Sequence, residues 1–143
     1  MRPIYETQRD RDNENEAKLK IEAVGKCKLQ KLPIAYNADW LALRENKIVA
    51  VVEYKRRTFE RNKFTTIFIG LDKWMNSKRL AEEIGVPFIL FIEWTDGLYY
   101  HEVGTAPVTY GIGGRTDRND PQDIGPVVHI PITAFKTCRN IEE

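Results

Sequence analysis

The sequence has few of the side chains that several common classes of site require. Its 143 residues include two cysteines and two histidines, too few for a disulfide framework and without the spacing of a zinc site. Ser77 is the only serine, and no nucleophile-elbow motif surrounds it. The stretch Gly111–Gly114 lacks the following lysine and the strand-to-helix context of a phosphate-binding loop. These observations argue against a zinc protein, a serine hydrolase and a P-loop enzyme.

Long hydrophobic runs are also absent. The longest, Val86–Ile92, is far too short to cross a bilayer, and no N-terminal segment has the pattern of a signal peptide. We therefore expect a cytoplasmic, intracellular protein that has reduced thiols and does not associate with membranes. A length of 143 residues, with 42% hydrophobic and 30% charged residues, fits a single globular domain over residues 1–143.

The charged residues are unevenly distributed although the net charge is only +1. Local basic clusters on a near-neutral protein could attract a polyanion, or they could be solvated faces, and charge alone leaves both readings open. The basic residues gather in two clusters, which are Lys18, Lys20, Lys26, Lys28 and Lys31, and then Lys55, Arg56, Arg57, Arg61 and Lys63.

Hydrophobic periodicity and turn residues predict one helix and three strands in the first half of the chain. Asn13 is a suitable helix N-cap and Gly25 a natural stop, with apolar residues at helical spacing between them. The polar connection 44–47 joins two apolar segments, which indicates an antiparallel hairpin. We expect a loosely held polar arm over 1–12, a helix over 13–24, and strands over 28–32, 38–43 and 48–55.

A second helix and further strands are predicted in the rest of the chain. The run PFILFIEW is typical of a strand buried on both faces, and the Asp-Gly pair at 96–97 predicts a hairpin after it. The order α-β-β-β-α-β-β predicts an α/β fold with a mixed central sheet flanked by helices. We expect a helix over 71–84, strands over 87–94 and 98–103, a long loop over 104–125 and an edge strand over 127–132.

The strand VAVVEYKRR combines a hydrophobic run with two charges near its end. Alternation along the strand puts Glu53 and Lys55 on one face and Tyr54 on the other. Burying such charges costs free energy unless something pairs with them. An ion pair within the strand is one explanation, and a catalytic site is the other.

The preceding strand supplies a second carboxylate, Asp39. A three-residue hairpin loop, Glu45–Lys47, puts Asp39 directly opposite Glu53 on the same face, whereas a loop of two or four residues puts it on the other face. Asn46 favours the three-residue loop, since such loops need a residue that tolerates a left-handed backbone. The sequence therefore predicts two carboxylates side by side.

Two facing carboxylates repel each other, so the pair requires a raised pKa or a cation. Carboxylate oxygens suit Mg²⁺, which keeps several waters and commonly bridges to phosphate. A metal ion held there could activate water and neutralise charge on a phosphodiester, while Lys55 could orient that water or stabilise the developing charge. The hydrophobic strand and the hairpin that align these groups favour this reading over a simple ion pair.

The order of helix, strand with Asp, and strand with Glu-x-Lys resembles the PD-(D/E)XK nuclease superfamily. The matching pieces are Asn37-Ala38-Asp39, thirteen further residues and Glu53-Tyr54-Lys55, and the resemblance covers about residues 13–94. Ala38 stands where a proline is often found. The arrangement is also similar to small junction-resolving endonucleases of phages and prophages. This resemblance implies a restriction-endonuclease-like α-β-β-β-α-β core with extra C-terminal strands.

The resemblance also implies the chemistry, which is hydrolysis of DNA phosphodiester bonds with Mg²⁺ or Mn²⁺, with branched or nicked DNA as candidate substrates. Asp39 and Glu53 would hold the metal ion, with the main-chain carbonyl of Tyr54 as a further candidate ligand. Many members add a glutamate from the first helix. Glu14 is preferred for this position because it shares the apolar face of the helix, and Glu16, which fits a capping box, is the competitor.

DNA is the expected partner, and a homodimer is left open because two subunits could cut two strands. A non-catalytic nucleic-acid-binding or assembly module that keeps the nuclease fold is the rival hypothesis. Each basic residue near the site can equally be a solvated charge, since phosphate contacts carry no sequence signature of their own. The candidates for phosphate contacts are Lys31, Arg56, Arg57, Arg61, Lys63 and Lys73.

Overall fold

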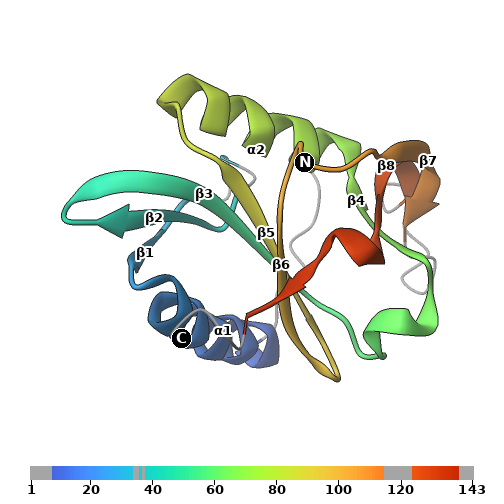
Figure 1. Cartoon of the computed structure of the whole chain (residues 1–143), viewed down its shortest axis with the longest axis horizontal. Coiled ribbons are helices and arrows are strands. Elements are labelled where there is room, and N and C mark those ends of the chain that lie inside the picture. The colour runs from blue at the N-terminus through green and yellow to red at the C-terminus, as the bar shows by residue number, and fades with distance from the viewer. Residues whose placement is uncertain (1–7, 34–35, 37, 115–123, 139–143) are drawn as a thin grey trace.

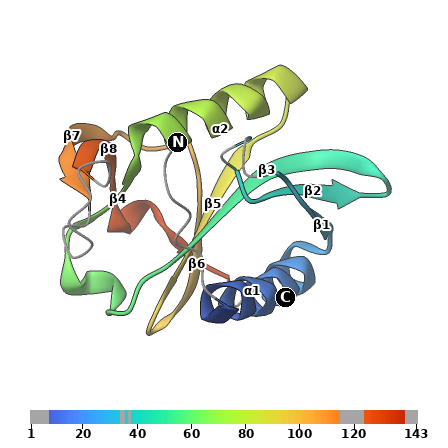
Figure 2. The same cartoon turned by 180° about the vertical axis from the view of Figure 1, so that it is seen from behind.

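A computed structural model describes residues 8–33, 36, 38–114 and 124–138. In this part of the chain, two helices lie on opposite faces of a six-stranded sheet, and a three-stranded sheet lies beside the second helix (Figure 1). The view from behind shows the same layers (Figure 2). None of the helices in the described ranges is both long and apolar enough to span a membrane.

The six-stranded sheet is mixed, as the sequence predicts. β3 and β5 run parallel, while the other neighbouring strands run antiparallel. The strands, in their order across the sheet, are β1 (Lys28–Lys31), β2 (Trp40–Arg44), β3 (Lys47–Arg56), β5 (Phe88–Trp94), β6 (Gly97–Glu102) and β9 (Lys136–Thr137).

The helices α1 (Gln8–Gly25) and α2 (Leu71–Ile84) cover the two faces of this sheet. Successive side chains of β3 point to opposite faces, so its apolar residues contribute to both cores. The core under α1 includes Ile21, Trp40, Val52 and Phe91. The core under α2 includes Val51, Trp74, Ala81, Leu90 and Ile92.

The three-stranded sheet is antiparallel, with the order β4-β8-β7. Its inner residues join the core under α2, and β4 leads directly into that helix at Gly70. This connection places the first turn of α2 over the C-terminal half of β3. The strands are β4 (Thr66–Gly70), β7 (Thr109–Gly114) and β8 (Ile124–Pro131), and the short 3-10 helices are η2 (Arg61–Lys63) and η4 (Ile132–Ala134).

The predicted helix over 71–84 is confirmed with the same bounds. It ends because Gly85 adopts a left-handed backbone, with φ of 84°, and its N–H donates to the carbonyl of Ala81. The predicted strands over 28–32, 38–43, 48–55, 87–94 and 98–103 are present with small shifts at their ends.

The prediction of a loose arm over 1–12 is wrong for residues 8–12, because α1 begins at Gln8 rather than at Asn13. This first turn buries nothing, so it carries no hydrophobic periodicity. Side-chain hydrogen bonds support it instead: Gln8 donates to Asp12 and accepts from Arg11, both at 2.9 Å. Residues 1–7 lie outside the described residues.

The prediction of one long loop over 104–125 is also wrong, because β7 lies within it and pairs with β8 over six residues. Its glycines suggest turns, but Gly111 and Gly113 lie in the strand where an added Cβ would come within 3.5 Å of His129 and 3.4 Å of Val127. The strand predicted over 127–132 is central in its sheet rather than at an edge. Residues 115–123 lie outside the described residues.

Candidate active site

β3 carries a carboxylate into the interior of the protein. Glu53 is fully buried, with 0% of its surface exposed, and it faces Leu90 of the parallel strand β5. It shares a face with Val51, whose side chain belongs to the core under α2. Lys55, two residues further on, points to the same face.

The hairpin between β2 and β3 has a different turn from the predicted one. Arg44 pairs with Lys47, so the loop has two residues, Glu45 and Asn46, instead of three. Both have positive φ, 51° and 66°, which is typical of a type I′ turn with the twist of a hairpin. With no other change, this turn would put Asp39 on the wrong face.

A β-bulge at Val49 corrects the register, since the pairing shifts by one residue at this point. Beyond the bulge, Trp40 faces Val52, and the same register continued by one residue brings Asp39 opposite Glu53. The buried residues on both sides of the hairpin explain this outcome. A slip of one residue would expose the side chains that both helices cover.

Backbone hydrogen bonds from two neighbouring strands hold Asp39 in place. Its N–H donates to the carbonyl of Val52 at 3.2 Å, and its carbonyl accepts from the N–H of Leu32 at 3.0 Å. Its side-chain Oδ2 accepts from the N–H of Tyr54 at 2.8 Å. The carboxylate is therefore fixed beside the segment that carries Glu53 and Lys55.

Burial raises the pKa of the Glu53 carboxyl, and the nearby charge of Asp39 raises it further. The positive charges of Lys73 and Lys55 oppose this, and the pKa lies at about 8. Glu53 therefore shares a buried space with another carboxylate and remains costly to ionise in spite of two nearby amines.

Burial lowers the pKa of the Lys55 amine, and the like charges of Lys73 and Arg57 act in the same direction. Glu53 and Asp39 oppose the decrease, and the pKa lies at about 8. An amine whose pKa lies near neutrality can gain or lose a proton readily, which is a property of groups that act in catalysis.

A second amine reaches the site from the first turn of α2. The Nζ atom of Lys73 lies 2.7 Å from Oε1 of Glu53. Burial lowers the pKa of Lys73, but the charges of Glu53 and Asp39 outweigh this effect and the pKa is raised. Lys73 is therefore held as a cation against the buried carboxylate.

The carboxylates of Asp39 and Glu53 fit a hard divalent cation. Oε2 of Glu53 is buried and has no hydrogen-bond partner among the described residues. An unpartnered carboxylate oxygen beside a second carboxylate is the arrangement that a cation with oxygen ligands would satisfy. In the described ranges, no group of three or more His, Cys, Asp and Glu side chains is close enough to hold a metal ion. Two carboxylates with water as the remaining ligand suit Mg²⁺, which rarely has an all-protein shell.

Glu14 lies on α1, across the sheet from Glu53, and pairs with Lys31. Its side chain is partly buried, whereas Glu16 is exposed. Its charge contributes to raising the pKa values of Lys73 and Tyr54, so it acts on the site electrostatically. The structure therefore places Glu14 within electrostatic reach of Lys73 and Tyr54, in an ion pair of its own.

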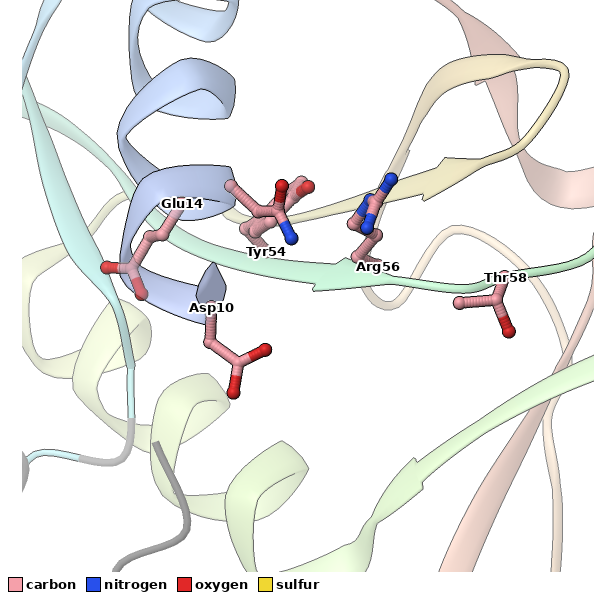
Figure 3. Close-up of a pocket in the computed structure, with 6 residues that line it drawn as sticks. Asp10, Glu14, Tyr54, Arg56 and Thr58 are labelled. Carbon is pink, nitrogen blue, oxygen red and sulfur yellow. The ribbon is translucent and has the colours of Figure 1, made fainter. Parts of the chain in front are cut away.

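A pocket of about 280 Å³ opens beside Glu14 (Figure 3). Its two acidic residues, Asp10 and Glu14, project from α1, as Figure 3 shows. Asn13 also belongs to α1, Tyr54 and Arg56 belong to the end of β3, and Thr58 follows that strand. This makes the pocket polar and mixed in charge. Its lining consists of Asp10, Asn13, Glu14, Tyr54, Arg56 and Thr58.

The residues predicted to contact phosphate have different surroundings. Lys31 and Lys73 are both engaged with carboxylates, and Arg56 is exposed at the pocket. Arg57 is half-buried, and burial lowers its pKa. Of these, Arg56 is the best placed to meet a ligand at the pocket.

Arg61 and Lys63 lie further along the chain, in η2. The guanidinium of Arg61 lies 5.0 Å from the centre of the Tyr99 ring, and Nη1 donates to the carbonyl of Ile132 at 3.4 Å. Lys63 is exposed, and its amine lies 5.4 Å from the centre of the Phe59 ring. Arg61 therefore connects η2 to Tyr99 and Ile132, whereas Lys63 lies at the surface.

The contact between Lys73 and Glu53 was not foreseen from the sequence, which suggested only a phosphate contact for Lys73. A signal for it was present. Lys73 lies four residues before Ser77 and eight before Ala81, so the three share one face of the helix. Ser77 and Ala81 are buried against the sheet, which directs Lys73 to the sheet as well.

Comparisons with known proteins confirm the predicted family. The model of the family described as "Phage putative PDDEXK endonuclease" matches residues 1–138. Among solved structures, Hjc of Archaeoglobus fulgidus, a Holliday junction resolvase from an archaeal hyperthermophile, has a similar fold with a TM-score of 0.58 and 10% identity. That similarity covers 90% of this chain and 99% of the resolvase. No curated protein matches the sequence.

Proposed function

Because the chain belongs to the phage PDDEXK endonuclease family, we propose that it hydrolyses DNA phosphodiester bonds at the Asp39–Glu53 pair with a divalent metal ion. The restriction-endonuclease-like fold agrees with this activity. The observation that carries the proposal is the buried Oε2 of Glu53, which lies beside Asp39 and Lys55 and has no hydrogen-bond partner in the described part of the chain. A protein without cation chemistry has no evident use for such a costly arrangement.

In this proposal, Asp39 and Glu53 hold Mg²⁺ or Mn²⁺, and the main-chain carbonyl of Tyr54 is a further candidate ligand. When bound, the ion would polarise the phosphodiester and lower the pKa of a water molecule. The N–H of Tyr54 orients Asp39 by donating to Oδ2, so the backbone of β3 positions both carboxylates. Lys55, with its lowered pKa, would orient the attacking water and exchange a proton with it.

Glu14 is the proposed third carboxylate, in preference to the exposed Glu16. It would have to leave Lys31 to reach an ion held by Asp39 and Glu53, because Glu14 and Lys31 form an ion pair. Exchange of an exposed lysine for a divalent cation is electrostatically favourable for a carboxylate, because the ion carries twice the charge.

We propose DNA as the substrate class, with branched or nicked duplexes as the first to test. The structural neighbour is a Holliday junction resolvase, which supports this choice of probe through similarity of fold. A homodimer, which could cut two strands, is part of the same proposal. The exposed Arg56 at the pocket beside Glu14 would bind a phosphate group of the DNA backbone.

The experiment that tests the proposal measures cutting of supercoiled plasmid and of a synthetic four-way junction, with and without Mg²⁺ or Mn²⁺. We expect cutting only with the metal ion, no cutting by Asp39→Asn, and cutting about 10²-fold slower by Lys55→Ala, the usual contribution of one proton-transfer group. Undiminished cutting by both variants would contradict the assignment of the site.

The same samples test the rival function of a non-catalytic DNA-binding or assembly module. Such a module binds DNA without the metal ion and does not cut it under any of these conditions. Calorimetry with Mn²⁺ separates the two, because the nuclease requires binding that is lost in a Glu53 variant.

A further prediction concerns Arg56 and the salt dependence of DNA binding. In a Lys55→Ala background, which keeps the DNA largely intact, we expect Arg56→Ala to weaken binding of every DNA sequence alike. The slope of log K against log salt concentration should decrease by about one unit, as for the loss of one phosphate contact. Fluorescence anisotropy at several salt concentrations measures both effects.

The matched control is Lys47→Ala, which removes a charge from the exposed opposite end of the same strand. We expect its slope to equal that of the parent protein. Equal slopes for both variants would show that Arg56 makes no phosphate contact.

A further inference from the structure

The site contains two acidic and two basic side chains whose charges act on one another. Asp39 and Glu53 are the acidic groups, and Lys55 and Lys73 are the basic ones. When all four groups are ionised and no metal ion is bound, the two ammonium groups balance the two carboxylates. A divalent ion adds two positive charges in a space with little solvent, so its binding favours the departure of an ammonium group.

Lys73 is the group placed to leave, because its amine is the one that pairs directly with Glu53. Lys73 lies in the first turn of α2, and 31% of its side chain is exposed, compared with 1% for Glu53. Its long, flexible side chain can therefore carry the amine to solvent without any movement of the backbone.

Lys73 also lies against the carboxylate that a metal ion would bind. Its Nζ lies 2.7 Å from Oε1 of Glu53, whereas Oε2 has no hydrogen-bond partner among the described residues. An ion that binds both Glu53 and Asp39 would repel an ammonium group at this distance, since like charges this close interact strongly in a buried site.

We propose that Lys73 is the resident counter-cation of Glu53, that a divalent metal ion displaces it, and that the displaced ammonium group then binds the phosphate group to be cut. This inference rests on the proposed function and assigns Lys73 two successive partners. The lysine would keep the buried carboxylate paired before the metal ion binds. Afterwards it would contribute a positive charge at the mouth of the site, where the phosphate carries its negative charge.

The first test is calorimetric titration of Mn²⁺ into the wild-type protein and into Lys73→Met. Methionine removes the competing charge but keeps an unbranched side chain of similar length. We expect Lys73→Met to bind Mn²⁺ about tenfold more tightly or better, because the ion no longer has to displace a cation. At saturating Mn²⁺ the same variant should cut DNA about 10- to 100-fold more slowly, because a phosphate contact is lost.

Lys78→Met is the matched control, because Lys78 is on the same helix and its amine lies 4.8 Å from the centre of the Trp74 ring rather than at Glu53. Its Mn²⁺ affinity and cutting rate should equal those of the wild type. Lys73→Gln provides a second variant if the methionine leaves Glu53 too poorly paired for folding, since glutamine can still donate a hydrogen bond. We expect it, too, to bind Mn²⁺ more tightly than the wild type.

The second test needs only the wild-type protein for the titration itself. The side-chain CH₂ signals of Lys73 are assigned by their absence from Lys73→Gln and followed by NMR while Mg²⁺ is added. We expect them to move toward the positions of solvent-exposed lysines, whereas the signals of Lys78 stay in place.

Each outcome has a distinct meaning. Equal or weaker Mn²⁺ binding by both Lys73 variants, or Lys73 signals unchanged at saturating Mg²⁺, would overturn the displacement and leave the proposed nuclease intact. Tighter Mn²⁺ binding with unchanged cutting would overturn the phosphate contact. Absence of Mn²⁺ binding in all of the proteins would overturn the metal-dependent function on which the inference rests.

Discussion

Glu53→Gln is expected to abolish DNA cutting and, at pH 8, to make the metal-free protein more stable. The loss of activity follows from the loss of a carboxylate ligand, and we expect at least a 10³-fold decrease in rate, a size common for removal of a group essential to transition-state stabilisation. The gain in stability follows from burial, because a neutral amide has no charge to desolvate. A residue that a protein retains at a cost in stability is commonly one that it needs for function.

The raised pKa of Glu53 determines how the stability of the metal-free protein changes with pH. The pKa of Glu53 is raised from 4.5 to about 8 in the folded protein, so between these values the folded state holds a proton that the unfolded state has lost. Stability therefore decreases as the pH rises through this window, by at most about 1.4 kcal/mol per pH unit. The pKa of Lys55 is lowered to about 8 in the folded protein. The cost in stability of burying this amine therefore decreases only as the pH rises above 8.

We expect Glu53→Gln and the wild type to have similar melting temperatures at pH 5. At pH 8 the variant should melt roughly 5–10 °C higher, given the usual change of a few degrees per kcal/mol in a protein of this size. Addition of Mn²⁺ should raise the melting temperature of the wild type and leave that of the variant unchanged. Differential scanning calorimetry at both pH values measures these effects.

The control is Glu83→Gln, which neutralises an exposed carboxylate on α2. It should match the wild type in activity, in melting temperature at both pH values and in response to Mn²⁺. A Glu53→Gln protein that is less stable than the wild type at pH 8 would contradict the argument that this carboxylate is costly to bury.

Trp40→Ala is expected to cause the largest loss of stability, because Trp40 is 1% exposed and belongs to the core between α1 and the sheet. Its ring centre lies 6.2 Å from that of Tyr54. Truncation of a buried aromatic side chain costs about 3–5 kcal/mol through lost burial and the cavity left behind. We expect a decrease in melting temperature of about 10 °C or more, measured by circular dichroism.

The same substitution should also weaken Mn²⁺ binding, since Trp40 adjoins Asp39 and anchors the strand that positions it. Leu19→Ala is the control, because Leu19 is on α1 but is 68% exposed, and we expect it to change stability by less than about 0.5 kcal/mol. Equal unfolding midpoints for the two variants would contradict the role given to the core under α1.

Much of the secondary structure could be predicted because it depends on local patterns. The helix over 71–84 combines an apolar face with a glycine that ends it, and both signals lie within the segment itself. The first turn of α1 and the strand β7 could not be predicted in this way. The former is held by polar side-chain pairs, and the latter exists only because β8 pairs with its glycine-rich sequence.

The hairpin combines a wrong prediction of the loop length with a confirmed prediction that Asp39 lies beside Glu53. The loop has two residues instead of three, which alone would turn Asp39 away from Glu53. The bulge at Val49 restores the register because burial on both faces of the sheet depends on it. The packing of both faces of the sheet determines which residues of the hairpin pair. The two-residue turn alone does not determine this.

The sequence by itself determined the chemical composition of the candidate site, because Asp39, Glu53 and Lys55 follow from a motif on two adjacent strands. It also determined the mixed α/β fold, through the order and spacing of the apolar segments. Only the tertiary structure decided that Lys73 meets Glu53 and that Glu14 pairs with Lys31. These contacts join residues 20 and 17 positions apart on different elements, so they depend on how the helices pack on the sheet.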